Sequence, residues 1–202
     1  MFHNYTASIL LAWCERKDAR LQDLILDAKR AGLATNVLAK RKDTAQLDIL
    51  VSRFPDSSDL IDIAGAGSGV SQTLPILVAL RFADQGRLVY IEEPESHLHP
   101  KAQIALAGIL ADAARRGVRV VIETHSALLL RAIQTLVADG SLSPELVKLH
   151  WFRLDDRGVT QIDTANLDQN GAFGDWPEDF DETILGAETR FLDAVEGRTA
   201  PQ

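Results

Sequence analysis

The sequence has few of the features that mark a secreted or membrane-bound protein. It contains a single cysteine, Cys14, so no disulfide can form within the chain, which fits a reducing compartment. No apolar run approaches the roughly 20 residues that span a bilayer. No basic residue precedes the apolar N-terminal patch, as one would in a signal peptide. These absences exclude a disulfide scaffold and predict a cytoplasmic protein that does not bind membranes.

A second absence concerns phosphate binding. The P-loop pattern G-x-x-x-x-G-K-[ST] does not occur: residues 1–60 contain one glycine, Gly32, and no lysine lies between Lys42 and Lys101. The stretch "DIAGAGSGVSQTLP" (62–75) has three alternate glycines, a spacing that also differs from the dinucleotide pattern G-x-G-x-x-G. Taken alone, this stretch is best interpreted as a tight-turn loop at the end of a hairpin.

Composition places the chain among ordinary globular proteins. Its 202 residues are 46% hydrophobic and 25% charged, enough to bury one core without disulfides. The net charge of −8 is uneven, because residues 155–202 carry twelve acidic and three basic side chains. This imbalance favours a solvated acidic surface, and the basic cluster at 40–42 is too short to indicate nucleic-acid binding.

The order of apolar patterns predicts an α/β fold. Residues 5–33 have helical spacing that ends at Gly32, and strand-like runs at 46–54 and 59–65 flank a hairpin loop. Then follow a helix at 71–84 with Pro75 in its first turn, a strand at 87–93, a helix at 100–117, a strand at 118–125, a helix at 126–140, and a closing pair of strands at 146–154 and 158–163. Alternating strands and helices predict a parallel sheet with flanking helices, whose strands at 87–93 and 118–125 are buried on both faces.

Polar side chains gather where these two strands end. Glu92 and Glu93 follow the first strand, and Thr124 and His125 follow the second. Because the carboxyl ends of parallel strands meet at one edge of a sheet, we expect these side chains to lie together. Burial of Glu93 beside another acid would suit a general base.

Three motifs in this order resemble the ATP-binding-cassette ATPases, in particular the branch related to DNA-repair and overcoming-lysogenization-defect ATPases. "GAGSGVSQTLPIL" is similar to the signature loop of that branch, "LVYIEEPESHLHP" to its Walker B strand and D-loop, and "VVIETHS" to its switch histidine. "GAFGDWPEDFDE" resembles a short C-terminal domain that often follows. The resemblance covers roughly residues 20–185 and predicts three regions: a helix and hairpin at 1–60, an incomplete P-loop-NTPase-like core at 61–165, and an acidic appendage at 166–202.

The resemblance assigns roles around the phosphates of ATP. Glu92 matches the acid that holds Mg²⁺ through water, although the family usually has Asp there. Glu93 matches the catalytic acid that polarises the attacking water, and His125 matches the residue that contacts the γ-phosphate. His97 and His99 also form a His-x-His pair, but a zinc site would lack clear third and fourth ligands. The D-loop interpretation is preferred, with His99 in the place of the usual Asp.

The glycine-rich loop would then contact ATP held by another subunit. Gly69 lets the backbone approach, while Ser68 or Ser71, together with Gln72, donates hydrogen bonds beside a helix N-terminus. The alignment of the serines with the family's Ser-Gly-Gly-Gln leaves both hydroxyls as candidates.

The missing P-loop defines the central hypothesis. Without it the chain resembles the C-terminal half of an ATPase, completed by a P-loop-bearing segment or subunit in an ATP-dependent dimer. The alternative is a non-catalytic interaction module that retains the fold. Genome maintenance or anti-phage defence, with a nucleic-acid or nuclease partner, follows only from the family.

Overall fold

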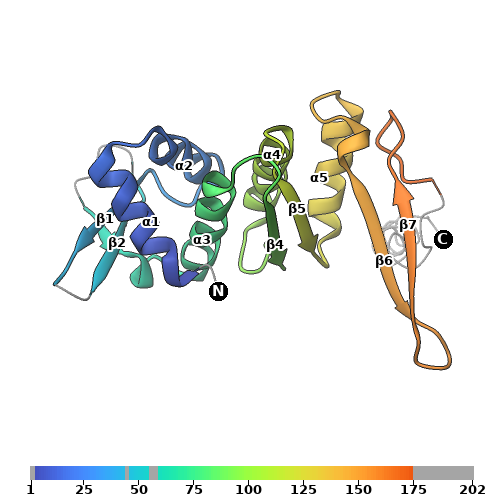
Figure 1. The fold of residues 1–202 in the computed structure, drawn as a ribbon, viewed down its shortest axis with the longest axis horizontal. Helices are drawn as coiled ribbons and strands as arrows, with labels where there is room; N and C mark the ends of the chain where they lie inside the picture. Colours follow the sequence, from blue (N-terminus) through green and yellow to red (C-terminus); the bar gives the residue numbers. More distant parts are fainter. Residues whose placement is uncertain (1–2, 44–45, 55–58, 175–202) are drawn as a thin grey trace, which may run out of the picture. The chain divides into compact units, whose positions relative to one another are not determined.

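The computed structural model describes residues 3–43, 46–54 and 59–174, which form two compact units, Met1–Ile133 and Gln134–Gln202. The first unit contains α1 (His3–Arg16), α2 (Ala19–Arg30), β1 (Asn36–Arg41), β2 (Leu47–Ser52), β3 (Ile61–Asp62), η1 (Ile63–Gly65), α3 (Ser68–Phe82), β4 (Leu88–Glu92), α4 (Pro100–Arg115) and β5 (Arg119–Glu123). Helix α5 (Ala127–Ala138) crosses the boundary, and η2 (Pro144–Leu146), β6 (Lys148–Leu154) and β7 (Thr160–Asn166) belong to the second unit (Figure 1).

The N-terminal helical region is two helices rather than one. Lys17 adopts a positive φ of 51°, and the Asp18 carboxylate then caps α2 by accepting a hydrogen bond from the Arg20 amide at 3.0 Å. The prediction that Gly32 ends the helical region is confirmed. Its φ of 67° turns the chain so that the Leu33 amide bonds the Ala28 carbonyl at 2.9 Å, next to the bond from the Gly32 amide to the Lys29 carbonyl at 2.9 Å.

An antiparallel sheet in the order β1-β2-β3 follows these helices. The predicted hairpin is confirmed, because β2 pairs with β3 antiparallel. Sequence reasoning missed β1, which pairs with β2 along its whole length. Its buried side chains, Val37 and Ala39, flank the half-buried Leu38 and are followed directly by the basic cluster, so the apolar signal is short.

Helix α3 begins at Ser68, earlier than predicted. Gly67, with a φ of 95°, lies just before it, so Pro75 lies inside the helix and the prediction of a first-turn proline is wrong. Because proline has no amide hydrogen, the Ser71 carbonyl receives no helical hydrogen bond from position 75.

Strands β4 and β5 are parallel neighbours, as predicted, with Glu92 opposite Glu123. Two further backbone hydrogen bonds extend the ladder: the Arg119 amide bonds the Arg87 carbonyl, and the Glu93 amide bonds the Glu123 carbonyl, each at 2.8 Å. Glu93 and His125 therefore follow strands that end at the same edge, which confirms the expected layout.

The two faces of this sheet differ, and the prediction of strands buried on both faces is wrong. One face carries Ile91, which is 7% exposed, and the half-buried Val89, Val120 and Ile122. Helix α4 packs against β5, as Figure 1 shows. The opposite face carries Leu88, Tyr90 and Val121, which are 64%, 54% and 47% exposed.

The core of the first unit lies among its helices. The fully buried large side chains include Leu10, Leu24, Leu74, Leu77, Leu80, Leu106 and Ile109. A buried ion pair joins α2 to α3, where the Asp27 carboxylate accepts hydrogen bonds from Nε and Nη2 of Arg81 at 2.5 and 2.8 Å. This pairing raises the pKa of Arg81 above its ordinary value. The helical layer thus holds α3 firmly in place.

In the second unit β6 and β7 pair antiparallel over seven residues each, which confirms the predicted pair. Most of the predicted acidic appendage (166–202) lies outside the described residues, including "DWPEDFDE". Among the helices that the structure describes, none combines the length and apolar character that a membrane span requires.

Candidate functional site

Three segments meet at the carboxyl end of the β4–β5 sheet. They are the start of α3 after the glycine-rich loop, the connection between β4 and α4, and the connection between β5 and α5. These segments carry the three motifs found in the sequence.

The glycine-rich loop is held by neighbouring side chains. The Asp62 carboxylate caps η1 through the Ala64 amide at 2.8 Å, and the Arg53 guanidinium donates to the Ala66 carbonyl. A Cβ placed on Gly69 would lie 2.9 Å from the His97 carbonyl oxygen, closer than real contacts allow. Gly69 is therefore required where α3 approaches the connection after β4. Sequence reasoning missed Arg53, because a single arginine in a hairpin gives no signal.

The two adjacent acids at the end of β4 differ in backbone conformation. Glu92 ends the strand and is exposed, whereas Glu93 has a positive φ of 41°. The Glu93 carboxylate accepts a hydrogen bond from Ser96 Oγ at 3.0 Å. Both acids are exposed, so the condition of burial under which Glu93 would suit a general base is not met within this chain.

Glu95 connects the two strand ends, and sequence reasoning did not select it. Its Oε1 accepts hydrogen bonds from Thr124 Oγ1 at 2.6 Å and from the His125 amide at 3.0 Å. Its other oxygen, Oε2, is buried without a partner in the structure. Glu95 therefore fixes the backbone at His125, whose own side chain is exposed.

A second polar link runs between the same connections. Ser126 Oγ donates to Gln103 Oε1 at 2.8 Å, and Gln103 Nε2 donates to the Leu98 carbonyl at 3.0 Å. Ser126 Oγ also accepts from the Leu129 amide at 3.0 Å, at the start of α5. These bonds join the connection after β4 and the start of α4 to the segment that holds His125.

The two histidines of His-x-His have separate structural roles. His97 has a φ of 64° and supplies the carbonyl against Gly69. His99 is the N-cap of α4, where its Nδ1 accepts from the Lys101 amide at 3.3 Å. Within the described part of the chain, no three His, Cys, Asp or Glu side chains form a metal cluster.

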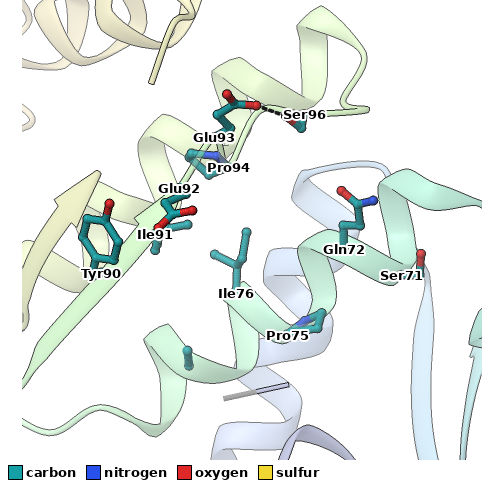
Figure 2. A pocket seen from close by; sticks show the side chains of 11 residues that line it. Ser71, Gln72, Pro75, Ile76, Tyr90, Ile91, Glu92, Glu93, Pro94 and Ser96 are labelled. Carbon is teal, nitrogen blue, oxygen red and sulfur yellow. Dashed lines mark hydrogen bonds between the residues drawn. The ribbon is translucent and has the colours of Figure 1, made fainter. Parts of the chain in front are cut away.

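A pocket of about 800 Å³ brings together four of the candidate residues, Ser71, Gln72, Glu92 and Glu93. In Figure 2, Ile76 on α3 and Glu92 on β4 border the same space, and Glu93 bonds Ser96 at its rim. The other lining residues are Pro75, Ile76, Ala79, Tyr90, Ile91, Pro94 and Ser96. Ser68, Gly69, His99 and His125 do not line it.

Negative charge accumulates at this end of the sheet. Tyr90 donates its hydroxyl hydrogen to Glu123 Oε2 at 2.7 Å, and this bond raises the pKa of Tyr90 to about 12. In the described chain, Glu92, Glu93, Glu95 and Glu123 form no salt bridge.

The lining residues fit a Mg²⁺–phosphate ligand only in part. Glu92 offers an exposed carboxylate of the kind that Mg²⁺ binds directly or through water. However, the pocket lining contains no lysine or arginine to neutralise a triphosphate. The described pocket therefore offers carboxylates of the kind that such a ligand needs, but no cation.

Comparison with known proteins gives one sequence match. A family model described as "AAA domain, putative AbiEii toxin, Type IV TA system" matches residues 1–131. No curated protein matches the chain in sequence.

Solved structures of SMC ATPases have a similar fold. A chain of an SMC ATPase, studied for ATP-driven dimerization and DNA-stimulated activation, has a TM-score of 0.57 at 11% identity, with 95% of this chain and 98% of that chain covered. An SmcHead bound to the C-winged helix domain of ScpA gives 0.55 at 13% identity, with 77% and 45% covered. The Smc head domain derived from Pyrococcus furiosus, with an extended coiled coil and bound to the C-terminal domain of ScpA, gives 0.52 at 11% identity, with 90% and 39% covered.

These identities establish the fold alone, which is the mixed α/β fold of SMC-type ATPase heads. The chain spans less than half of the second and third of these structures, whereas it spans nearly all of the first.

Proposed function

The chain belongs to this AAA-domain family, and we propose that it is the C-terminal part of an ATP-hydrolysing ABC-type ATPase. In this proposal a P-loop-bearing segment or subunit supplies the phosphate-binding cations. The chain supplies the acids, the switch histidine and the signature loop.

The observation that carries the proposal is the composition of the pocket. Glu92 and Glu93, at the end of β4, line it together with Ser71 and Gln72, which lie on helix α3 about twenty residues earlier. The two acids suit a magnesium–phosphate ligand, and the absence of a lysine or arginine in the lining explains why a second segment is needed. Ser71 and Gln72 lie beside the acids but are assigned below to a separate ATP.

Each acid has a distinct proposed role. Glu92 would hold Mg²⁺ through water, and the bound ion would supply neutralisation of phosphate charge. Glu93 would accept the proton of the attacking water, with the Ser96 hydroxyl fixing its carboxylate. Both carboxylates reach the pocket without a competing salt bridge in the described chain.

The remaining candidates act on the terminal phosphate. His125, held through its backbone by Glu95, would contact the γ-phosphate. Ser71 and Gln72, with Ser68 and Gly69 before them, would face ATP bound by another subunit, which makes the active form an ATP-dependent dimer. His99 would contribute through the D-loop, by fixing the start of α4.

Partners follow from the same proposal. One similar SMC ATPase undergoes ATP-driven dimerization, and two similar heads bind ScpA. We place this chain in the overcoming-lysogenization-defect branch, with genome maintenance or anti-phage defence as its setting and a nucleic-acid or nuclease partner. The alternative is a non-catalytic interaction module, which the absence of a cation in the pocket lining favours.

Glu93→Gln tests the catalytic assignment. The chain would be mixed with the polypeptide encoded directly upstream, and ATP hydrolysis and binding measured with saturating Mg-ATP. Glu93→Gln should lower turnover by about 10²–10⁴-fold and retain nucleotide binding, because an amide cannot act as the base. The matched control Glu145→Gln, on η2, should not change turnover. If the Glu93→Gln variant hydrolyses ATP at the parent rate, Glu93 is not the general base. If the parent mixture does not hydrolyse ATP, the result favours the non-catalytic module.

Gln72→Glu tests the proposed contact between subunits. The side chain is exposed and lines the pocket, so the substitution adds negative charge with little change in shape. It should weaken ATP-driven dimerization in sedimentation experiments, whereas Gln22→Glu on the exposed surface of α2 should not. Gln72 is a cleaner position than Gly69, where any side chain would also displace the His97 carbonyl. Normal dimerization of Gln72→Glu would mean that this loop does not face a partner's phosphate.

A further inference from the structure

Glu95 lies in the turn that follows β4, close in sequence to the candidate base. Figure 2 shows Glu93, Pro94 and Ser96 in the same turn. Two backbone hydrogen bonds hold it: the Ser96 amide bonds the Glu93 carbonyl at 3.0 Å, and the Leu98 amide bonds the Glu95 carbonyl at 2.9 Å. The backbone of Glu95 is therefore fixed to the turn that carries Glu93.

The hydrogen-bond ladder between β4 and β5 stops one step before His125. The Glu93 amide bonds the Glu123 carbonyl at 2.8 Å, and continued alternation of a parallel ladder would next pair the His125 amide with the Glu93 carbonyl. Glu93 instead has a positive φ of 41°, and its carbonyl accepts from the Ser96 amide. The His125 amide is left to the Glu95 carboxylate, which accepts from it at 3.0 Å. A side chain thus takes the place of the next backbone acceptor.

One carboxylate oxygen holds the whole segment that follows β5. Besides the His125 amide, Oε1 of Glu95 accepts from Thr124 Oγ1 at 2.6 Å. Thr124 Oγ1 in turn accepts from the Ser126 amide at 3.0 Å. Three consecutive residues, 124–126, therefore depend on Glu95 for their position.

A closed ring of hydrogen bonds stabilises this arrangement. Ser126 Oγ donates to Gln103 Oε1 at 2.8 Å, and Gln103 Nε2 donates to the Leu98 carbonyl at 3.0 Å. The Leu98 amide returns to the Glu95 carbonyl, which closes the ring through Thr124. Because Gln103 lies on α4, the ring attaches the segment to a helix of the core.

The segment uses Glu95 as a hydrogen-bond acceptor rather than as a charge. The other oxygen, Oε2, is buried and has no hydrogen-bond partner within the described chain. Glu95 also forms no salt bridge among the described residues. The imidazole of His125, by contrast, is exposed. Its backbone is held while its side chain remains accessible to a ligand.

We infer that Glu95 is a positioning residue for His125. Its Oε1 fixes the backbone of the switch histidine relative to the turn that carries Glu93, so that the imidazole is placed for the γ-phosphate. This inference rests on the proposed function. It gives Glu95 a role in turnover that is exerted through His125, without contact between Glu95 and the nucleotide.

Hydrogen exchange of the chain alone tests the hydrogen bonds. Glu95→Ala should speed exchange of the His125 amide roughly tenfold or more, because this amide then loses its acceptor. Thr124→Val should have the same effect on the Ser126 amide, whose acceptor is the Thr124 hydroxyl. Glu95→Gln and Thr124→Ser keep the acceptor oxygens and should leave both amides protected. Urea unfolding of each variant verifies that it is folded.

ATP turnover tests the positioning role. The full-length chain would be mixed with the polypeptide encoded directly upstream, and kcat and KM measured with Mg-ATP. Glu95→Ala should lower kcat roughly ten- to hundredfold and change KM less than about threefold, because a misplaced imidazole is felt mainly in the transition state. Glu95→Gln should retain most of the turnover. The control Glu145→Ala, at an exposed position on η2, should leave kcat and KM unchanged.

A double-mutant cycle tests whether Glu95 acts through His125. In a His125→Ala background, Glu95→Ala should lower kcat no further, because the imidazole that it positions is already absent. Losses that multiply would overturn the inference, since Glu95 would then act by another route. Thr124→Val, with Thr124→Ser as its matched control, repeats the cycle from the other side of the bond, so the test does not depend on the stability of Glu95→Ala.

The outcomes separate the positioning role from the proposed function. Unchanged exchange of the His125 amide in Glu95→Ala would overturn the inference and leave the function standing. Faster exchange with an unchanged kcat would do the same, because the role of Glu95 would then be structural only. Equal losses of kcat in Glu95→Gln and Glu95→Ala would also overturn the inference, because the charge would then matter rather than the acceptor. A parent mixture without ATP hydrolysis would contradict the function and, with it, the role of Glu95 in turnover.

Discussion

Ile91 and Leu88 lie three residues apart on β4, yet Ile91 is 7% exposed and Leu88 is 64% exposed. Ile91 lies on the buried face of the sheet, whereas Leu88 shares the exposed, open face with Tyr90 and Val121. Both are branched aliphatic residues of the same size, so their environments alone distinguish them. The comparison separates residues whose burial stabilises this chain from residues whose exposed side chains are available for contact with another chain.

The first prediction tests the helical layer on which the covered face depends, and it has the largest expected effect. Asp27→Ala should lower the free energy of unfolding by about 3–5 kcal/mol, because it removes both hydrogen bonds of the partly buried Arg81 guanidinium to Asp27 and leaves it only the more distant carboxylate of Asp23, at 3.7 Å. Urea unfolding followed by circular dichroism measures this. Asp163→Ala, which removes the exposed partner of Arg153, is the control and should leave the unfolding midpoint unchanged. Equal midpoints for the two variants would contradict the importance of the buried pair.

The second prediction compares the two faces directly. Ile91→Ala should destabilise the isolated chain by about 2–5 kcal/mol, because it removes a side chain that is only 7% exposed and leaves a cavity in its place. Leu88→Ala should change stability far less, since its side chain already contacts water. Thermal and urea unfolding of both variants provide the measurement. A large loss for Leu88→Ala would show that something in this chain covers the open face.

The third prediction concerns the polar end of the open face. Glu123→Gln should lower the pKa of Tyr90 from about 12 toward its ordinary value, because the carboxylate hydrogen bond holds the phenol proton. Ultraviolet absorbance of the phenolate between pH 9 and 12 follows this change, with circular dichroism to verify folding. Glu145→Gln should leave the titration unchanged. If Glu123→Gln also leaves it unchanged, the Tyr90–Glu123 bond does not exist in solution.

The fourth prediction has the smallest expected effect and concerns Asp18, the N-cap of α2. The side-chain hydrogen bond from Arg20 lowers the pKa of Asp18 to about 2 from 3.8. Because the pKa of Asp18 is lower in the folded chain than in the unfolded chain, its carboxylate stabilises the fold at pH values above the unfolded-state pKa. This contribution is lost as the pH falls from about 4 to about 2. Asp18→Asn keeps an N-cap but should make the unfolding midpoint less dependent on pH in this range. An unchanged pH profile would mean that Asp18 does not contribute.

Much of the fold was predictable because its signals are local. Pro100 at the start of α4, the glycine after α2 and the apolar runs of β4 and β5 are each contained in a few residues. The break at Lys17 gave no such signal, since nothing in its residue type requires a positive φ. The apolar run of β4 could not reveal an open face, because a strand shows the same composition whether its second layer belongs to its own chain or to another.

The residues of the candidate site also differ in whether a local sequence signal could reveal them. The sequence predicted that Glu92 and Glu93 lie at one edge of the sheet with Thr124 and His125, and the two strands do end together. That Ser71 and Gln72 line the same pocket as the two acids became visible only in the structure. Glu95 was missed because its partners lie about thirty residues away and only the tertiary fold brings them together. The catalytic and binding roles of Glu92, Glu93, Ser71 and Gln72 remain predictions.

Calorimetric titration of the purified chain with Mg-ATP, alone and after addition of the polypeptide encoded upstream, tests the central claim most directly. The chain alone should bind no Mg-ATP measurably, because the described pocket has acids and no lining cation. Addition of the upstream polypeptide should create binding. A micromolar dissociation constant for the chain alone, about −8 kcal/mol, would contradict the claim that its nucleotide site is completed by another segment.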